Sequence, residues 1–407
     1  MYNAIICRYH EIAIKGNNRN MFETRMIENI YHLLRPVENI RVSKVRGRIW
    51  VEHKDKTPFT EKELDLINTQ MPKAFGLESF SPVIMTEPSL EAMQKAVDNS
   101  CRQYFDKAFE NQKVVSFRIR GKRSDKKFPL DSKQIEIELA RIVGKHYDYD
   151  SLNIDLENAD VTVWCELRAE FAFVYYETIR GPGGLPVGSN SPVLALLSGG
   201  IDSPVACYEI MKRGCRCDFI TFHSSPYTPQ DTVDKVKTIA KYLNRFQLPR
   251  RLFICNLAPM QKLIRDNCTP RFRTVLYRRM MFRIAERVAI RHKRFALLTG
   301  ESVGQVASQT IVNMATIDNA TNMLVLRPLV GADKNDVVNH ARRIGTYNLS
   351  KQQVPDSCTV FAPPSPATSA PVPRIEEEEA KLPEWEKVME EIIDSIEICD
   401  SEPDLQL

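Results

Sequence analysis

Short apolar runs alternate with longer amphipathic stretches in the second half of the chain. Strands are expected at 193–197, 217–222, 252–255, 295–299 and 323–327, and helices at 203–213, 229–244, 257–266, 273–293, 303–312 and 333–343. This alternation predicts an α/β domain with a parallel sheet. Ligands of such sheets bind beyond the carboxyl ends of the strands, so residues 198–203, 221–224 and 299–301 should line one crevice.

The first half of the chain has the pattern of two smaller α+β modules. In residues 1–60, a strand at 2–9, a helix at 19–34 and strands at 41–45 and 48–51 resemble a ferredoxin-like module. Residues 61–180 form the second module, with helices expected at 62–70, 89–107 and 131–147 and strands at 80–85, 114–120, 161–167 and 171–177.

A stretch rich in glycine and proline and an acidic stretch mark the remaining domain boundaries. Four glycines and two prolines in 181–191 are typical of a linker. The α/β domain then covers 192–375, and Glu376 begins an acidic tail, 376–407, that we expect to be solvated.

Composition favours a soluble intracellular protein. The N-terminus has no apolar core of signal-peptide length, and the chain has no run of about 18 apolar residues. We therefore expect a cytoplasmic protein that binds no membrane. The ten cysteines are better read as reduced thiols than as a disulfide framework.

A strand-to-helix turn, Ser-Gly-Gly-Ile-Asp-Ser at 198–203, is the strongest chemical motif. Small side chains and free N–H groups at a helix N-terminus favour an anion. The turn lacks the Lys of a P-loop and the third Gly of a dinucleotide motif, and it resembles the PP-loop of enzymes that use ATP and release pyrophosphate. The alternative is an ordinary polar turn. Asp202 within it could hold Mg²⁺ or cap the helix.

A basic stretch at 118–127 follows the strand expected at 114–120. Its six cations can neutralise RNA phosphates without reading bases: Arg118, Arg120, Lys122, Arg123, Lys126 and Lys127. The alternative is a solvated loop. Gly121 favours binding because it lets a backbone approach closely.

Further motifs bring a family resemblance. Residues 1–60, the stretch 118–130 and Asp160-Val-Thr-Val resemble a ferredoxin-like domain followed by a THUMP domain, which implies recognition of the tRNA acceptor stem. Five further motifs extend it: Arg-Tyr-His-Glu-Ile-Ala-Ile-Lys-Gly at 8–16, Phe-His-Ser at 222–224, Tyr-Arg-Arg-Met-Met at 277–281, Thr-Gly-Glu-Ser-Val-Gly-Gln-Val-Ala-Ser-Gln-Thr at 299–310 and Leu-Arg-Pro-Leu at 326–329. With the PP-loop, they resemble the tRNA sulfurtransferase (ThiI) family from residue 1 to about 370.

The resemblance implies an ATP-dependent transferase. It would adenylate the uridine at the eighth position of tRNA and replace the activated oxygen with sulfur, giving 4-thiouridine. It also implies an adenine nucleotide α-hydrolase-like PP-loop domain whose ATP site is formed by Leu196, Leu197, Ser198, Gly199, Gly200, Asp202, Ser203, Thr221, Phe222, Arg278, Gly300 and Gln309. Arg278 would offset phosphate charge.

Sulfur chemistry needs a cysteine that can carry a persulfide. Cys358 lies in Val-Pro-Asp-Ser-Cys-Thr-Val-Phe-Ala-Pro-Pro, a stretch without helical or strand periodicity, and it matches the family position of the persulfide. Its alternative is an inert loop thiol. Asp202 is the second residue that we expect in catalysis. Cys207 is a candidate resolving thiol, with core packing as its alternative.

The resemblance also implies partners and differences. A cysteine desulfurase should donate the sulfur, ATP should bind with Mg²⁺, and the family suggests a homodimer. The chain ends at Leu407 without the rhodanese domain of longer members, which puts a role in thiamine thiazole synthesis in doubt. Thr274 and Tyr277 stand where other members have the cysteines of an iron–sulfur cluster, so we expect no cluster.

Two other functions remain open. One is a different PP-loop ATP pyrophosphatase, such as an amide-forming synthetase. The other is a tRNA-binding protein whose ATP site only regulates it.

Overall fold

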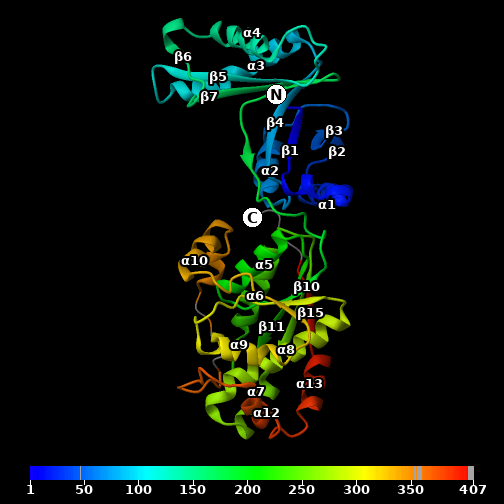
Figure 1. The fold of residues 1–407 in the computed structure, drawn as a ribbon, viewed down its shortest axis with the longest axis vertical. Helices are drawn as coiled ribbons and strands as arrows, with labels where there is room; N and C mark the ends of the chain where they lie inside the picture. Colours follow the sequence, from blue (N-terminus) through cyan, green and yellow to red (C-terminus); the bar gives the residue numbers. More distant parts are fainter. Residues whose placement is uncertain (46, 353, 355–359, 402–407) are drawn as a thin grey trace. The chain divides into compact units, whose positions relative to one another are not determined.

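The computed structural model describes residues 1–45, 47–352, 354 and 360–401, and the chain separates into two units, Met1–Gly184 and Leu185–Leu407 (Figure 1). The division falls within the stretch 181–191 that the sequence predicts to be a linker.

The first unit is built on a nine-stranded sheet in the order β2-β3-β1-β4-β8-β7-β5-β6, with β9 also paired to β4. Its strands are β1 (Ala4–Arg8), β2 (Ile40–Val45), β3 (Arg48–His53), β4 (Ser79–Thr86), β5 (Val115–Arg123), β6 (Leu152–Ile154), β7 (Val161–Leu167), β8 (Ala172–Tyr175) and β9 (Ile179–Arg180). Its helices are α1 (Arg19–Leu33), α2 (Glu61–Gln70), α3 (Leu90–Phe109) and α4 (Ser132–Gly144). Short 3-10 turns lie at Glu11–Ile14, Gly16–Asn18, Met71–Lys73 and Tyr149–Ser151.

Two apolar cores lie in this unit. One joins β1 to α1 and α2 through residues such as Ile5, Ile30 and Ile67. The other joins α3 and α4 to β5 and β7, with Leu139 and Val163. The helix α2, which we expected in the second module, therefore contributes to the first core.

Local sequence explains where two of these helices begin. A capping box starts α2, because the Thr60 side chain accepts from the N–H of Glu63 and the Glu63 carboxylate accepts from the N–H of Thr60. Asp131 and Gln134 start α4 in the same way. The strand β5 runs to Arg123, three residues beyond its expected end, because Gly121, Lys122 and Arg123 continue its parallel pairing with β7.

The second unit has a six-stranded sheet in the order β14-β13-β10-β11-β12-β15. Its strands are β10 (Val193–Leu196), β11 (Cys217–His223), β12 (Arg251–Asn256), β13 (Ala296–Leu298), β14 (Leu324–Leu326) and β15 (Glu397–Asp400). Its helices are α5 (Asp202–Lys212), α6 (Gln230–Leu243), α7 (Ala258–Asn267), α8 (Arg273–Arg291), α9 (Ile311–Asp318), α10 (Lys334–Arg343), α11 (Tyr347–Ser350), α12 (Val372–Glu379) and α13 (Trp385–Asp394), with 3-10 turns at Pro270–Phe272 and Ala307–Gln309.

The first five strands of this sheet are parallel, as predicted, so their carboxyl ends lie along one edge. The added strand β15 is antiparallel to β12. The predicted combination of α+β modules with a parallel-sheet domain is therefore confirmed.

The prediction of a helix at 303–312 is wrong. Residues 303–306 form a loop in which the N–H of Gly304, at φ +79°, donates to the carbonyl of Gln309. The helix α9 begins only at Ile311, because the Thr310 side chain caps it by accepting from the N–H of Asn313.

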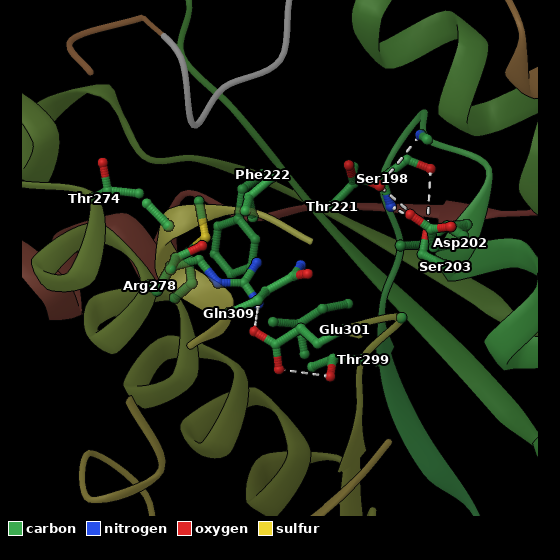
Figure 2. A pocket seen from close by; sticks show the side chains of 18 of the residues that line it. Ser198, Asp202, Ser203, Thr221, Phe222, Thr274, Arg278, Thr299, Glu301 and Gln309 are labelled. Atoms are coloured by element: carbon green, nitrogen blue, oxygen red, sulfur yellow. Dashed lines mark hydrogen bonds and ion pairs between the residues drawn. The ribbon is translucent and has the colours of Figure 1, made fainter. Parts of the chain in front are cut away.

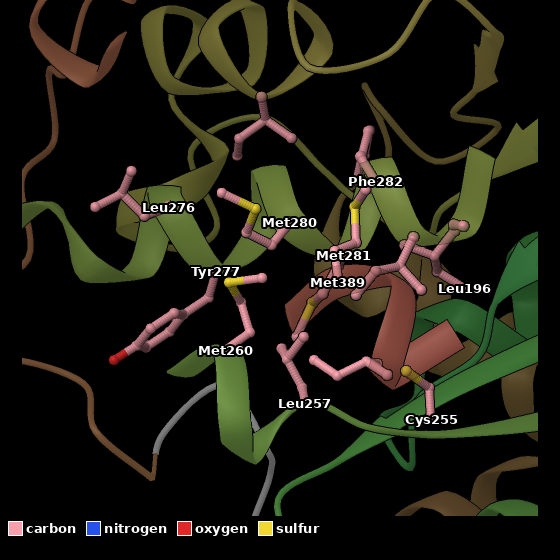
Figure 3. Close-up of a cluster of buried hydrophobic side chains, with 14 of the residues drawn as sticks. Leu196, Cys255, Leu257, Met260, Leu276, Tyr277, Met280, Met281, Phe282 and Met389 are labelled. Carbon is pink, nitrogen blue, oxygen red and sulfur yellow. The ribbon is translucent and has the colours of Figure 1, made fainter. Parts of the chain in front are cut away.

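The prediction that residues 376–407 form a solvated acidic tail is also wrong. Met389 on α13 packs into the core with Leu257, Met260 and Cys255 (Figure 3). The Glu379 carboxylate, 8% exposed, accepts hydrogen bonds from Arg279 and Arg283 on α8. The stretch is folded because arginines offset its buried carboxylates and every third or fourth residue is apolar.

None of the helices within the described residues is both long enough and apolar enough to cross a membrane.

Candidate active site

A cavity of 430 Å³ lies where β10, β11 and β13 end (Figure 2). Most residues of the predicted crevice line it, but Ile201, His223 and Ser224 do not. Eleven of the twelve expected nucleotide-binding residues are on its wall: Leu196, Leu197, Ser198, Gly200, Asp202, Ser203, Thr221, Phe222, Arg278, Gly300 and Gln309. Gly199 does not line the cavity. A Cβ added to it would come within 3.2 Å of Lys235 Cδ.

The turn at 198–203 is held by its own serines. The Ser203 hydroxyl accepts from the N–H of Ser198 at 3.0 Å, and the Ser198 hydroxyl accepts from the N–H of Gly200 at 3.3 Å. Gly300 packs directly against this turn, since a Cβ there would lie 2.6 Å from the Ser203 nitrogen. Glycine is therefore required where the β13 loop meets the start of α5.

Asp202 is the first residue of α5, and its side chain does not cap that helix. Its carboxylate accepts from Lys334 Nζ at 2.6 and 2.8 Å and from Gln305 Nε2 at 2.9 Å. The geometry thus opposes the cap interpretation. Lys334 was missed from the sequence, because it lies 132 residues from Asp202 and only the fold brings the two together.

The guanidinium group of Arg278 forms an ion pair at the cavity wall. It is paired with Glu301, which is 2% exposed and also accepts from Arg327 Nε at 2.8 Å and from the Thr299 hydroxyl at 2.9 Å. Burial by itself would raise the pKa of Glu301, but Arg278 and Arg327 outweigh it and hold that pKa below its ordinary value. Glu301 falls in the nominated segment 299–301, yet its sequence context gives no sign of its partners.

Other lining residues were also missed. They contribute a mostly apolar wall and come from β11, α8, the loop before α9 and the segment after residue 360: Ile220, Thr274, Met281, Val306, Ala307, Ser308, Ala362 and Pro366. Nothing in their local sequence distinguishes them from core residues.

Cys358, the expected persulfide carrier, lies outside the described residues. The described chain on both sides of it is held by contacts within the second unit, and after it Ala362 and Pro366 line the cavity. Lys235 Nζ donates to the carbonyls of Ser350 at 2.8 Å and Gln352 at 2.5 Å. On the other side, the Phe361 ring contacts the Tyr227 ring at 4.8 Å.

The described cysteines are poor candidates for sulfur transfer. All but Cys399 are buried. Burial raises the pKa of Cys207 far above its ordinary value and that of Cys268 to about 11, so both stay protonated at neutral pH. Packing, rather than a resolving role, is therefore the better interpretation of Cys207.

The basic stretch of the first unit divides between the two sides of β5. Arg118 and Arg120 donate to the carbonyl of Leu156, whereas Arg123 donates to the carbonyls of Phe128 and Leu130. Lys122, Lys126 and Lys127 are exposed. Arg120 is exposed as well, but its guanidinium donates to a backbone carbonyl. The arginines thus fasten local structure, whereas the three lysines are exposed cations.

Comparison with known proteins extends over the whole chain. A family model described as thiamine biosynthesis protein (ThiI) matches residues 188–383, a ThiI ferredoxin-like domain matches 4–81 and a THUMP domain matches 87–177. A probable tRNA sulfurtransferase of Moorella thermoacetica is 39% identical over 404 residues, covering 99% of both chains. One of Brevibacillus brevis is 37% identical, covering 98% of this chain and 96% of the relative.

A solved structure agrees with these relatives. A crystal structure of a 4-thiouridine synthetase–RNA complex with bound ATP is 32% identical, with a TM-score of 0.88, and covers 99% of this chain and 100% of that one. Both the sequence similarity and the fold therefore extend from end to end, and this chain belongs to the tRNA sulfurtransferase (ThiI) family.

Proposed function

We propose that this chain uses ATP to convert a uridine of tRNA, the one at the eighth position, into 4-thiouridine. The observation that carries the proposal is the cavity beside the turn 198–203, where Asp202 and Lys334 meet in a chain similar over its full length to a 4-thiouridine synthetase. An amide-forming synthetase would have no need of the THUMP domain at residues 87–177.

The first step is activation of the base. The uridine O4 attacks the α-phosphorus of ATP, the bond to pyrophosphate breaks, and the N3 proton leaves to solvent. The N–H groups of the first turn of α5 would hold the departing pyrophosphate, because a helix leaves these donors without partners inside the helix. Lys334 would place a positive charge beside it, fixed by Asp202.

Mg²⁺ fits this site. The ion usually takes one or two carboxylates and completes its shell with substrate phosphates and water. Asp202 is a carboxylate on the cavity wall and would hold it, and the ion would neutralise phosphate charge.

The second step is sulfur transfer. A terminal persulfide sulfur on Cys358 attacks C4 of the adenylated base and AMP leaves. A thiol from a reductant outside the chain then attacks the Cys358 sulfur, forming a mixed disulfide with Cys358 and releasing 4-thiouridine as the leaving thiolate. Two observations support Cys358: eight other cysteines are buried, and Lys235 and Phe361 fasten the described chain on either side of it.

The remaining assignments concern partners. Lys122, Lys126 and Lys127 would contact tRNA phosphates, because exposed lysines neutralise a nucleic-acid backbone. Asp202 and the cavity residues named above would bind ATP. A cysteine desulfurase would supply the persulfide, and a homodimer in the cytoplasm would be the working form.

One assay separates this function from its alternatives. Purified protein with ATP, a desulfurase and cysteine should form AMP only when unmodified tRNA is added, and mass analysis of the tRNA nucleosides should find 4-thiouridine. AMP formation independent of tRNA would favour an amide-forming synthetase, and no AMP at all would favour a regulatory ATP site.

A further inference from the structure

Another cavity, of 430 Å³, lies at the edge of the six-stranded sheet where the parallel strands begin. Its wall is formed by Pro249, Arg250, Arg251, Arg294 and Asp400. Arg251 is the first residue of β12, and Arg294 lies two residues before β13. The candidate active site lies where such strands end, so this arginine pocket is a separate place on the second unit.

The buried carboxylate of Asp218 holds two of the three guanidinium groups. Asp218, the second residue of β11, is fully buried. Arg250 donates to its two oxygens from Nε and Nη2, each at 3.1 Å, and Arg294 forms an ion pair with the same carboxylate. The backbone N–H of Arg251 also donates to it, at 3.2 Å. One carboxylate therefore fixes the positions of two guanidinium groups.

All three arginines have protein partners, so what matters for a ligand is the balance of charge. Arg251 meets Asp400 at 3.7 Å, and their side chains are 51% and 84% exposed, so this pair is weak. Three guanidinium groups against two carboxylates leave a net charge of about +1 even when Asp400 is counted in full. The side chains of Arg250 and Arg294 are only 22% and 13% exposed. Positive charge in excess and partly removed from water favours a bound anion.

The neighbouring His292 reports the same excess of positive charge. Burial lowers the pKa of its imidazole, and Arg251, Arg294 and Arg291 lower it further, whereas Asp218 opposes them. An anion bound among these cations would raise the pKa of His292, because a nearby negative charge favours the imidazolium form.

Exposed cations continue from the pocket to the surface. Lys293 and Arg291 are exposed and stand directly before Arg294 in the chain. Arg291 meets Asp394 at 3.4 Å, but both side chains are more than half exposed, so a phosphate can compete for this cation. Several exposed cations beside one pocket suit a chain of phosphates better than a single small anion.

We propose that the arginine pocket binds a phosphate group of the tRNA backbone. The planar forks of Arg250, Arg251 and Arg294 match the oxygens of a phosphate, and such a contact positions an RNA without reading its bases. The second unit then adds a phosphate contact of its own to those of the exposed lysines in the first. The inference rests on the proposed function only in that tRNA is the RNA bound.

The first test removes one cation from the pocket. Arg251→Gln keeps the backbone N–H that bonds Asp218, so the buried pairs remain. It should lower the slope of log tRNA affinity against log salt by about 0.7–0.9, which makes its loss of affinity about threefold larger at 50 mM than at 200 mM salt. The tRNA-dependent formation of AMP at saturating tRNA should be unchanged, because the pocket is not part of the active site.

Arg287→Gln is the matched control. Arg287 is 59% exposed, is paired with the half-exposed Glu390 at 3.1 Å and does not line the pocket. Its loss removes the same charge from the same unit and should leave the salt slope nearly unchanged. A thermal melt of both variants checks that they are folded.

The second test uses His292 as a local probe. The chain has seven histidines, and His292→Gln identifies the His292 signal in NMR spectra of protein labelled with ¹³C-histidine. Bound tRNA should raise the pKa of His292 by about half a pH unit or more, and inorganic phosphate should do the same only at a much higher concentration. Arg251→Gln should reduce the response to both probes.

The outcomes distinguish the inference from the proposed function. An equal fall of the salt slope in Arg251→Gln and Arg287→Gln would mean that only general surface charge acts, and it would overturn the pocket. A His292 pKa raised by inorganic phosphate but not by tRNA would make this a site for a small free anion and overturn the RNA assignment. No response to either probe would overturn the site itself. Wild-type protein that binds no tRNA would instead contradict the proposed function.

Discussion

The two units of the chain use charge in opposite ways. In Met1–Gly184, the cations that we connect with function, Lys122, Lys126 and Lys127, are exposed. In Leu185–Leu407, the comparable charges are buried and paired, as Glu301 is with Arg278 and Arg327. Exposed cations attract a polyanion over a distance and without sequence preference. Buried pairs hold donors in fixed positions, which chemistry on one atom requires.

The largest effect that tests this comparison is expected from a substitution of Asp202. Asp202→Ala should abolish adenylation, a loss of about a thousandfold, because it releases Lys334 and removes the carboxylate expected to hold Mg²⁺. Affinity for tRNA should change by less than about twofold, since the exposed lysines lie in the other unit. AMP formation and tRNA binding are measured on the same preparation, with the exposed Asp231→Ala as control. A wild-type adenylation rate would show that Asp202 has no part in activation.

A second test concerns the buried pairs themselves. Glu379→Gln should destabilise the second unit by about 3–5 kcal/mol, because it leaves the buried Arg279 and the half-buried Arg283 without their carboxylate. Glu377→Gln, at an exposed position two residues away, should leave the unfolding midpoint unchanged. Urea unfolding compares the two variants. Equal stability of both would mean that the C-terminal stretch is as solvated as its composition suggests.

The same pairs predict how stability depends on pH. Burial opposes the charged forms of Glu301 and Glu379, but their arginine partners lower the pKa of both carboxyls. Their stabilisation is therefore complete above the ordinary glutamate pKa of about 4.3 and is lost as the pH falls through their lower folded-state values. Thermal melts from pH 6 to pH 3 should show this loss, and a smaller one in Glu379→Gln. A variant with the wild-type pH dependence would exclude Glu379 as a source.

The smallest effect is expected from the exposed cations. Replacing Lys122, Lys126 and Lys127 with alanine should weaken tRNA binding and lower the slope of log affinity against log salt by about 0.7–0.9 for each lost phosphate contact. The structure favours these three over Arg120 and Arg123, whose guanidinium groups bond to backbone carbonyls. Lys145→Ala, another exposed position in the unit, serves as control. An unchanged slope would return the stretch to ordinary solvated surface.

The sequence predicts most of the strands and the residues of the candidate site. It does not predict how the charged side chains of that site pair with one another. The parallel strands are apolar runs bounded by polar turns, so local pattern is enough to find them, and the turn 198–203 has a recognisable composition. The pairing of Asp202 with Lys334, and of Arg278 with Glu301, joins residues 132 and 23 positions apart. Such contacts depend on tertiary packing, which no local pattern reports.

The C-terminal stretch 376–407 is a second case in which tertiary contacts overrule the local sequence pattern. A run of four glutamates is typical of solvated surface, and only the arginines of α8 make burial of Glu379 possible. The helix expected at 303–312 failed for a local reason that was present in the sequence, because Gly304 and the cap at Thr310 both favour a later start.

The central claim, that one active site activates the base and a separate sulfur carrier then replaces its oxygen, is tested most directly with Cys358→Ser. This variant should bind tRNA and ATP and form AMP in a tRNA-dependent way, yet produce no 4-thiouridine with desulfurase and cysteine, because a hydroxyl cannot carry a transferable persulfide sulfur. Free sulfide at high concentration should restore part of the product. Full desulfurase-dependent thiolation by Cys358→Ser would contradict the account and remove Cys358 from the mechanism.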